Sequence, residues 1–521
     1  MSHPFKSLHP MGERDISKKT TQKAQTPVDT YAGKLHVEWD PSAAVTPLGQ
    51  LPFFIEFLKT SRLFDDFVED CPMKFTSNNA SSVRDILGSM MLSILSGHTR
   101  YSHVTALRGE SVNAELLGMK KMVSEDVIRR SLLSIDEDKG SAWLEKHLKK
   151  CYAPLLTIPW VLDLDATVKP LYGKQEGAEI GYNPTKPGRP SHVYHSYFIA
   201  NIRFALGVDV QNGKNIAGHY SASHLWKILD ALPRAQWPQF IRGDISYGTE
   251  KIMSEAESRE TKYLFKVKCT RNIKALIKRN MEHNRHWENV GCGFEGVEDI
   301  IRLEGWSQSR RVIILRKKIK NKDIGVLQQE KLSDQSKQLT FHFAEIDNKT
   351  SAYEHAVLVT NLDDEIFTLA HHYRDRGDSE NNFDELKNQW GWCGYTTQDL
   401  KRCKIIGKFI ALIYDWWNIF TRLVDPNCHR EAVTSRPQLL NATGKLTEHG
   451  RQKVLTITST HAKTEKIAKT LTVISRFFKS LQETAEQLTS PVILKRIIET
   501  AFRKFFEKRN DPPSVVLSAP A

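Results

Sequence analysis

Hydrophobic positions recur every three to four residues along the first part of the chain. The segments LGQLPFFIEFLKTSRLFDDFV and SSVRDILGSMMLSILSG, both between residues 45 and 150, gather their apolar side chains on one helical face. Ser124 is placed to cap a further helix, because Glu125 and Asp126 then fall in the first turn, where acidic side chains are favoured. The pattern predicts a helical domain over 35–150, either a plain bundle or one that includes a DNA-binding helix pair.

Beyond residue 157 the hydrophobic period shortens to two, which is typical of strands. The strand-like segments are PWVLDLDATV, HSYFIANIRFALGVDV, QFIRGDISYG and KYLFKVKC, with helical stretches at 223–232 and 249–260 among them. A meander of three strands is thus followed by alternating strand and helix. Residues 151–270 are predicted to form the first part of a mixed α/β sheet.

Strand-like segments continue over 271–370, namely RRVIILRKKI, QLTFHFAEI and EHAVLVTNL. A helical pattern returns at 371–400 and continues over 401–510. The N-terminal tail is polar and basic without periodicity, and both ends, 1–34 and 511–521, are predicted to be disordered. The predicted fold class is α+β and multidomain: a mixed α/β domain interrupted by a β-rich insertion, with helical N- and C-terminal domains.

Composition is that of an ordinary water-soluble protein, with 40% hydrophobic and 26% charged residues in 521. The longest apolar run, 405–420, is interrupted by Lys408 and Asp415 and is too short to span a membrane. No apolar signal segment opens the chain, so we expect a cytoplasmic protein without a membrane partner. The seven cysteines include no C-x-x-C pair and indicate a reducing compartment rather than disulfides or structural zinc.

Positive charge is unevenly distributed. The net charge is +13, and residues 401–510 hold 21 Lys and Arg against 9 Asp and Glu. Such an excess favours a polyanionic partner. Charge alone leaves nucleic acid, an anionic membrane surface and a merely solvated face open.

Two aspartates lie in the first strand, and a third follows another strand. Asp163 and Asp165 point to the same side of a strand with a period of two, and burying two like charges without a cation is costly. Asp244 precedes a glycine turn in FIRGDISYG. Each aspartate alone is typical of a strand-end cap or turn. A divalent metal would remove the cost of bringing them together.

A charged stretch at 373–390, YRDRGDSENNFDELKNQW, has a regular spacing. If it is one helix, each residue turns it by about 100°, and Tyr373, Arg376, Glu380 and Lys387 share a narrow face. By itself this face is typical of a surface helix with ion pairs.

Glu380 would be the third carboxylate of a set with Asp165 and Asp244, which lie on separate elements. Magnesium prefers hard oxygen ligands, and two such ions about 3.5–4 Å apart activate a water or hydroxyl and stabilise the leaving oxygen of a phosphodiester. We therefore expect two Mg²⁺ ions, with Mn²⁺ able to substitute, held by these three residues. Arg376 and Lys387 would then bind DNA phosphates, and Tyr373 would position the strand.

The spacing of Tyr373, Arg376, Glu380 and Lys387 resembles the Y-R-E-K signature of bacterial insertion-sequence transposases of the DDE class, the IS-four-like group. The segments LDLDATVKPLYG and IRGDISYG resemble the two aspartate motifs of these enzymes. The resemblance covers roughly 80–400. It implies a ribonuclease-H-like catalytic domain interrupted between the second aspartate and the glutamate by the β-rich insertion.

The resemblance also implies cut-and-paste transposition. Such enzymes act as endonucleases at terminal inverted repeats of double-stranded DNA, and the freed 3′-hydroxyl attacks the other strand or the target DNA. The working unit would be a homodimer associated with the bacterial nucleoid. In this reading the domain at 35–150 binds DNA, and the one at 401–510 supports dimerisation and DNA contact.

Several assignments keep two readings. Trp306 and Trp287 are candidates to stack on a flipped base or to pack in the core. Asp384 shares the expected face of Glu380 and competes with it, whereas Asp163 is read as a supporting carboxylate. The loop at 172–195 carries cations that either drape over the DNA end or belong to an ordinary surface hairpin, among them Lys186 and Arg189.

Two other functions remain open. One is a catalytically inactive descendant that binds DNA and regulates transposition, which the intact set of three carboxylates argues against. The other is a hydrolase with two carboxylates, such as a glycosidase. A glycosidase would be expected to have an aromatic-rich cleft for sugars and no surplus of basic residues at the C-terminal end, and the sequence has that surplus. Metal-dependent cleavage of the element's own ends would discriminate among them.

Overall fold

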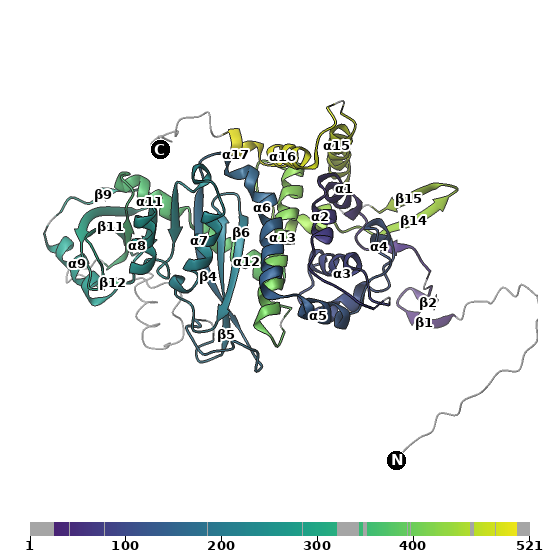
Figure 1. Ribbon diagram of the computed structural model, residues 1–521, viewed down its shortest axis with the longest axis horizontal. Coiled ribbons are helices and arrows are strands. Elements are labelled where there is room, and N and C mark those ends of the chain that lie inside the picture. The colour runs from purple at the N-terminus through teal and green to yellow at the C-terminus, as the bar shows by residue number, and fades with distance from the viewer. Residues whose placement is uncertain are drawn as a thin grey trace, which may run out of the picture. The chain divides into compact units, whose positions relative to one another are not determined.

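The structure is a computed structural model (Figure 1). It describes residues 25–507, apart from 41, 78, 185, 284, 320–342, 347–351, 393, 396, 459–462 and 485. Most of the N-terminal tail and all of the C-terminal tail that we expected to be disordered lie outside the described residues. The chain divides into two compact units after Ala44.

The first unit is a β-hairpin of two strands, β1 (Thr26–Thr30) and β2 (Gly33–Val37). Gly33 has φ +102°, a backbone conformation that favours glycine and closes the turn. Val28 pairs with Leu35, so a few alternating apolar residues form a short ladder. Residues 25–34 were expected to be disordered. The alternation here is too brief for the sequence pattern to reveal it.

A ten-stranded sheet dominates the second unit. Its first half has the order β6-β5-β4-β7-β8, in which β4, β5 and β6 form an antiparallel meander and β7 and β8 run parallel to β4. The strands are β4 (Val161–Pro170), β5 (Ser191–Ile199), β6 (Phe204–Asn212), β7 (Phe240–Gly243) and β8 (Tyr263–Lys266). The helices α7 (Ala222–Asp230) and α8 (Glu250–Ser258) lie between strands in the sequence, as the periodicity predicted.

The other half of the sheet comes from the stretch predicted to be β-rich. β13 pairs antiparallel with β8, and β11, β10 and β9 continue outward, so the strands extend the same sheet. A helix, α9 (Arg271–Glu282), precedes them. The strands are β9 (Glu288–Asn289), β10 (Phe294–Ile301), β11 (Arg310–Lys318), β12 (Phe343–Ile346) and β13 (Ala352–Thr360).

A long helix, α13 (Leu400–Val424), packs against β6 on one side and against α6 (Glu137–Tyr152) on another (Figure 1). Trp416 and Trp417 of α13 are almost fully buried. Phe67 stacks on Trp143 and Phe409, with ring centroids 4.3 and 5.3 Å apart, and so joins the N-terminal helices to this core. Large aromatic side chains contribute much of the apolar area buried in a core.

The N-terminal helices and the C-terminal elements share that core. Strand β14 pairs with both β15 and β3, and α1 packs against α15 and α16. Residues 401–510 therefore include a β-hairpin as well as helices. The N-terminal elements are β3 (Val45–Thr46), α1 (Leu51–Ser61), α2 (Leu63–Glu69), α3 (Val83–Leu95), α4 (Val112–Leu116) and α5 (Glu125–Ser134). The C-terminal ones are α14 (Ala432–Leu439), β14 (Gly444–His449), β15 (Gln452–Ile457), α15 (Thr464–Gln482), α16 (Ser490–Ala501) and α17 (Arg503–Glu507).

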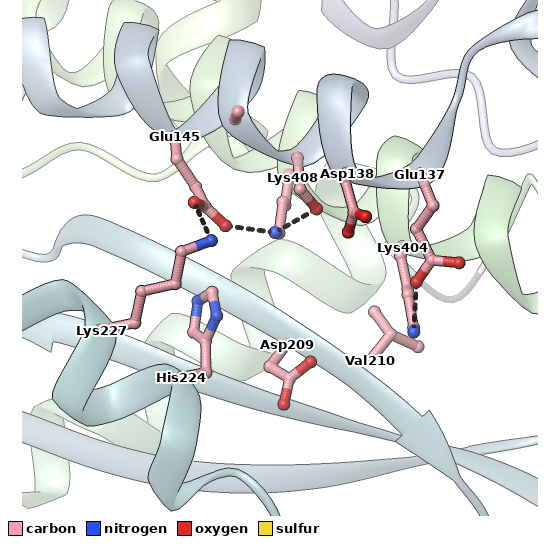
Figure 2. Close-up of a pocket in the computed structure, with 11 residues that line it drawn as sticks. Glu137, Asp138, Glu145, Asp209, Val210, His224, Lys227, Lys404 and Lys408 are labelled. Atoms are coloured by element: carbon pink, nitrogen blue, oxygen red, sulfur yellow. Dashed lines mark hydrogen bonds and ion pairs between the residues drawn. The ribbon is translucent and has the colours of Figure 1, made fainter.

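A polar cavity of about 460 Å³ lies between α6, α7, β6 and α13 (Figure 2). Its lysines are paired with carboxylates. Lys408 lies 2.7 Å from Glu145, Lys227 contacts the same carboxylate at 2.8 Å, and Lys404 lies 2.6 Å from Glu137. The positive charge in this cavity is therefore largely compensated. In the described part of the chain, we find no helix long and apolar enough to cross a membrane.

The charged stretch at 373–390 is not one helix. It is broken at Asp375 and Arg376, where the backbone N–H of Arg376 bonds to the carbonyl of Tyr373 in a tighter turn. Gly377, a weak helix former, follows directly. The two helices are α11 (Ile366–Arg374) and α12 (Gly377–Gln389). Tyr373 and Arg376 therefore do not share a helical face with the residues of α12.

Candidate active site

Asp165 lies in β4, and Asp244 comes directly after the end of the adjacent parallel strand β7. Leu164 of β4 pairs with Gly243 of β7, and each of these two residues is followed by one of the aspartates. The negative charge of Asp244 raises the pKa of Asp165, as expected for neighbouring carboxyl groups. β4 continues past Asp165 to Pro170 because it pairs with β5 along its length, so Asp165 sits in mid-strand rather than near the strand end.

The Asp165 carboxyl is buried, with 8% of the residue exposed. Its Oδ1 accepts a hydrogen bond from the backbone N–H of Ala166 at 2.8 Å, and its Oδ2 lies 2.8 Å from Nη2 of Arg376. Burial raises the pKa of Asp165, Arg376 lowers it and Asp244 raises it, giving a pKa of about 7. Arg376 thus compensates only part of the cost of placing two carboxylates together.

Arg376 points into the carboxylate pair. Burial lowers its pKa, but Asp165, Tyr373 and Asp244 together outweigh that effect, so the pKa is raised overall. Its Nε is buried and has no hydrogen-bond partner among the described residues. Tyr373 lies in the same cluster: burial raises the pKa of its hydroxyl, Arg376 lowers it, and Asp244 and Asp165 raise it. The sequence assigned Arg376 to DNA phosphate, whereas here it pairs with a carboxylate.

Asp163 is held by an arginine from the neighbouring strand. Nε and Nη2 of Arg242 donate to its two carboxylate oxygens at 2.5 and 2.7 Å, and both side chains are nearly fully buried. Arg242 also donates to the carbonyl of His372, which ties α11 to the sheet. Asp163 therefore has a structural partner of its own, in line with the supporting role expected for it.

Tyr247 supports the strand beneath the aspartates and was not singled out from the sequence. Its hydroxyl donates to the carbonyl of Asp165 at 2.9 Å and lies 3.2 Å from Nδ1 of His195. The His195 Nε2 is 2.9 Å from the carbonyl of Asn215. The sequence signal that could have indicated Tyr247 is its place three residues after Asp244, in the turn that follows β7.

Glu380 lies in the first turn of α12, a helix that packs against β4. The side chains of residues 378–380 are outside what the structure describes. Among the described side chains, no group of three or more His, Cys, Asp or Glu is placed to hold a metal ion. The third carboxylate expected from the sequence therefore stays a prediction, on a helix that borders the strand of Asp165.

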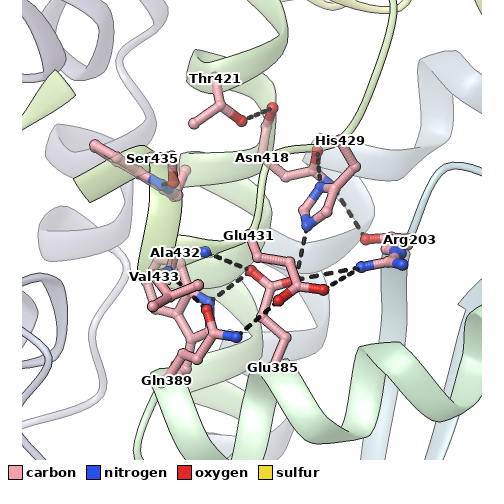
Figure 3. Close-up of polar contacts among 12 residues, drawn as sticks. Arg203, Glu385, Gln389, Asn418, Thr421, His429, Glu431, Ala432, Val433 and Ser435 are labelled. Carbon is pink, nitrogen blue, oxygen red and sulfur yellow. Dashed lines mark hydrogen bonds and ion pairs between the residues drawn. The ribbon is translucent and has the colours of Figure 1, made fainter. Parts of the chain in front are cut away.

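A buried carboxylate farther along α12 also escaped the sequence reasoning (Figure 3). Glu385 is 1% exposed; its Oε2 lies 2.7 Å from Nε2 of His429, and its Oε1 accepts hydrogen bonds from Nε1 of Trp390 at 3.2 Å and the N–H of Ala432 at 3.0 Å. His429 and Ala432 come from a segment some 45 residues away, which no local pattern indicates. Glu385 thereby anchors the C-terminal half of α12.

Asp384, the expected competitor of Glu380, is exposed and accepts a hydrogen bond from Asn388 at 2.6 Å on its own helix. Lys387 lines a cavity with Tyr172. Lys186 and Arg189 lie over the ring of that tyrosine, 4.9 and 4.8 Å from its centroid. Tyr172 therefore lies between the cations of the loop, which contact its ring, and Lys387, which lines the same cavity.

The tryptophans expected as stacking candidates are covered. Trp306 is 8% exposed, and Arg310 lies over its ring at 5.3 Å. Arg310 is fixed by two carboxylates, Glu250 and Glu257, at 2.5 and 2.6 Å. The burial of Trp306 therefore favours the packing reading, and its contact with DNA stays a prediction. Similarly, the ring of Trp287 is covered by Arg316 at 4.0 Å.

Comparison with known proteins identifies the family. A family model described as a transposase DDE domain, group 1, matches residues 74–479. No curated protein matches the chain significantly. One similar solved structure is a piggyBac transposase synaptic complex with hairpin DNA, at 10% identity and a TM-score of 0.38, covering 88% of this chain and 85% of that one. Because the family model spans most of the chain, the protein belongs to the transposase DDE domain group 1 family.

Proposed function

We propose that the protein catalyses cut-and-paste transposition of an insertion sequence. It would cleave DNA at terminal inverted repeats and join the freed 3′-hydroxyl to target DNA. The observation that carries this proposal is the register of β4 with β7, which places Asp165 of β4 beside Asp244, the residue that directly follows β7. The charge of Asp244 raises the pKa of Asp165. The family match to DDE transposases supports the same chemistry.

The strand order supports a ribonuclease-H-like catalytic domain. β4, β5 and β6 form an antiparallel meander, and β7 and β8 lie on the other side of β4 and run parallel to it. This arrangement brings the middle of β4 beside the carboxyl end of β7, an edge where active sites of α/β sheets gather. The placement of both aspartates there is what such a domain would require.

The carboxylates fit a hard divalent cation, because an oxygen donor pair with only partly compensated charge is what Mg²⁺ or Mn²⁺ prefers. DDE transposases generally use divalent metal ions. Asp165, Asp244 and Glu380 would hold two of them here. When bound, such ions activate the attacking oxygen and stabilise the leaving oxygen of a phosphodiester.

The surrounding residues would hold the two aspartates in place. Arg376 fixes one oxygen of Asp165, and Tyr247 fixes the backbone of β4 at the same residue. Arg242 ties β7 to β4 through Asp163, next to the site on both strands. The two carboxyl groups are therefore preorganised rather than free to move apart, which is what catalysis by charge stabilisation needs.

Double-stranded DNA would be the partner, bound by a homodimer that holds two ends together. The net charge of +13 supports a polyanionic ligand. Lys387, Lys186 and Arg189 are the cations proposed to contact phosphate near the active site. Tyr373 and Arg376 would act beside the carboxylates instead.

The test is cleavage of a labelled duplex that carries the repeats flanking the coding DNA, with MgCl₂ or with EDTA. We expect Asp165→Asn, Asp244→Asn and Glu380→Gln each to lose cleavage while retaining DNA binding. The matched control is Asp384→Asn, an exposed carboxylate on the same helix as Glu380, which should cleave like wild type. Metal-dependent cleavage by the Asp165 variant would overturn the assignment. A wild type that binds but never cleaves would instead indicate a regulator derived from a transposase.

A further inference from the structure

A second cavity, of about 640 Å³, is bordered by three segments far apart in the sequence. Arg100 and Arg129 come from the N-terminal helical part, Tyr172 follows β4, and Lys387 comes from α12. No Asp or Glu is among the described residues that line it. A cavity with cationic side chains and no acidic ones attracts an anion.

The cations of this cavity are much less compensated than those of the cavity between α6 and α13. Arg100 and Lys387 make no ion pair with any described residue. Arg129 has a carboxylate at 3.7 Å, that of Glu125, and its guanidinium lies 5.3 Å from the centroid of the Tyr101 ring, which orients it. Arg100 and Lys387 therefore keep their charge available for a ligand, and Glu125 compensates the charge of Arg129 only across 3.7 Å.

An exposed aromatic ring stands at the edge of the same cavity. Tyr172 is 68% exposed, and the cations of Lys186 and Arg189 lie within 5 Å of its ring centroid. Exposed aromatic rings beside a line of cations are the features of grooves that bind single nucleic-acid strands, where bases stack and phosphates pair.

We propose that this cavity binds a DNA strand, with Arg100, Arg129 and Lys387 on its phosphates and Tyr172 against a base. The choice of DNA as the anion rests on the proposed function. Lys387 follows Glu380 by seven residues, about 10 Å along a helix, which is the axial rise of about three base pairs. The strand would therefore leave the active site along α12 and reach the N-terminal helical part within a few nucleotides.

The test measures binding of two fluorescent probes, a 20-residue oligo-dT and a 30-base-pair duplex, between 50 and 200 mM NaCl. The variants are Arg100→Gln, Arg129→Gln and the double change. Arg108→Gln and Arg130→Gln are matched controls, since these exposed arginines are close in sequence but do not line the cavity. Arg129→Lys keeps the charge if the glutamine variant is unstable, and thermal unfolding checks the fold of each.

Loss of two phosphate contacts should lower the slope of log affinity against log salt by about 1.4 for the oligo-dT or about 1.8 for the duplex. The controls should leave it unchanged. A change with the oligo-dT alone identifies a single strand as the occupant, and a change with the duplex alone identifies double-stranded DNA. Tyr172→Leu, compared with Tyr172→Phe, should weaken oligo-dT binding about fivefold or more if a base stacks there.

If the double variant is folded and its slopes of log affinity against log salt equal those of the wild type, the proposal that this cavity binds DNA is overturned. Metal-dependent cleavage distinguishes this failure from failure of the proposed function. Wild-type protein that cleaves, beside a double variant with an unchanged slope, overturns only the cavity. If the wild type does not cleave DNA, but the double variant has a lower slope of log affinity against log salt than the wild type, only the catalytic proposal is overturned. If the wild type binds neither probe, both proposals are overturned.

Discussion

Nη2 of Arg376 lies 2.8 Å from Oδ2 of Asp165, which places a cation inside the candidate active site. Replacing it with glutamine removes the attraction that lowers the pKa of Asp165, so that pKa should rise above about 7. A metal binds the ionised carboxylate, and cleavage should therefore shift to higher pH and fall about tenfold or more at pH 7. The measurement is the cleavage rate against pH at fixed MgCl₂.

The control for Arg376→Gln is Arg374→Gln, two residues earlier, because Arg374 donates to the carbonyls of Val290 and Gly291 and not to a carboxylate. Its pH profile should match that of wild type. Identical profiles for the two variants would contradict a direct electrostatic role for Arg376.

The stability of the metal-free protein should depend on the Asp165 proton. The folded carboxyl has a pKa of about 7, above the value of about 3.9 in an unfolded chain, so unfolding releases a proton between these values. The contribution is complete below about pH 4 and is lost as pH rises through 7. This contribution to the free energy of unfolding is on the order of 2–4 kcal/mol. Urea unfolding in EDTA from pH 4 to 8 should show the decline, and Asp165→Asn should flatten it.

Asp163 should matter for folding rather than for metal binding. Asp163→Ala leaves Arg242 buried without its carboxylate, and breaking one side of a buried pair costs about 3–5 kcal/mol. The free energy of unfolding should fall by about that amount with or without Mg²⁺. If the loss instead appeared only when metal was present, Asp163 would be a ligand and the assignment to structure would be wrong.

Glu385 and Asp384 are adjacent but should differ sharply when neutralised. Glu385→Gln weakens a buried, charge-assisted hydrogen bond to His429 and should lower the free energy of unfolding by about 1–3 kcal/mol. Asp384→Asn is on the exposed side and should change it by about 0.5 kcal/mol or less. Urea unfolding of both variants at pH 7 makes the comparison, and equal effects would argue that Glu385 does not anchor α12.

The strands that carry the aspartates could be read from the sequence because their patterns are local. PWVLDLDATV and QFIRGDISYG are short, apolar and bounded by turn residues; β4 begins in the first segment and ends two residues beyond it, and β7 lies within the second. Their pairing could not be read, since the register of Leu164 with Gly243 depends on residues 79 positions apart. The proximity of Asp165 and Asp244 therefore came from a likeness of motifs and not from the pattern.

The helix break at Arg376 was missed for a different reason. A helical projection assumes a regular 100° per residue, and the charged run around Gly377 gives no hydrophobic signal of where one helix ends. The side chain of Arg376 turns towards Asp165, a contact across more than 200 residues of sequence. The cover over Trp306 could not be read from the sequence either, because Arg310, which lies over its ring, is itself positioned by two glutamates of α8.

The pairing of β8 with β13 limits how the stretch between Asp244 and α11 can move. Thr360, Val359 and Leu358 pair in register with Leu264, Phe265 and Lys266, so backbone hydrogen bonds join this stretch to the sheet that carries the candidate active site. A rigid-body movement of this stretch relative to β8 would break these hydrogen bonds. A displacement of the outer strands should therefore also displace β7, after which Asp244 begins the turn.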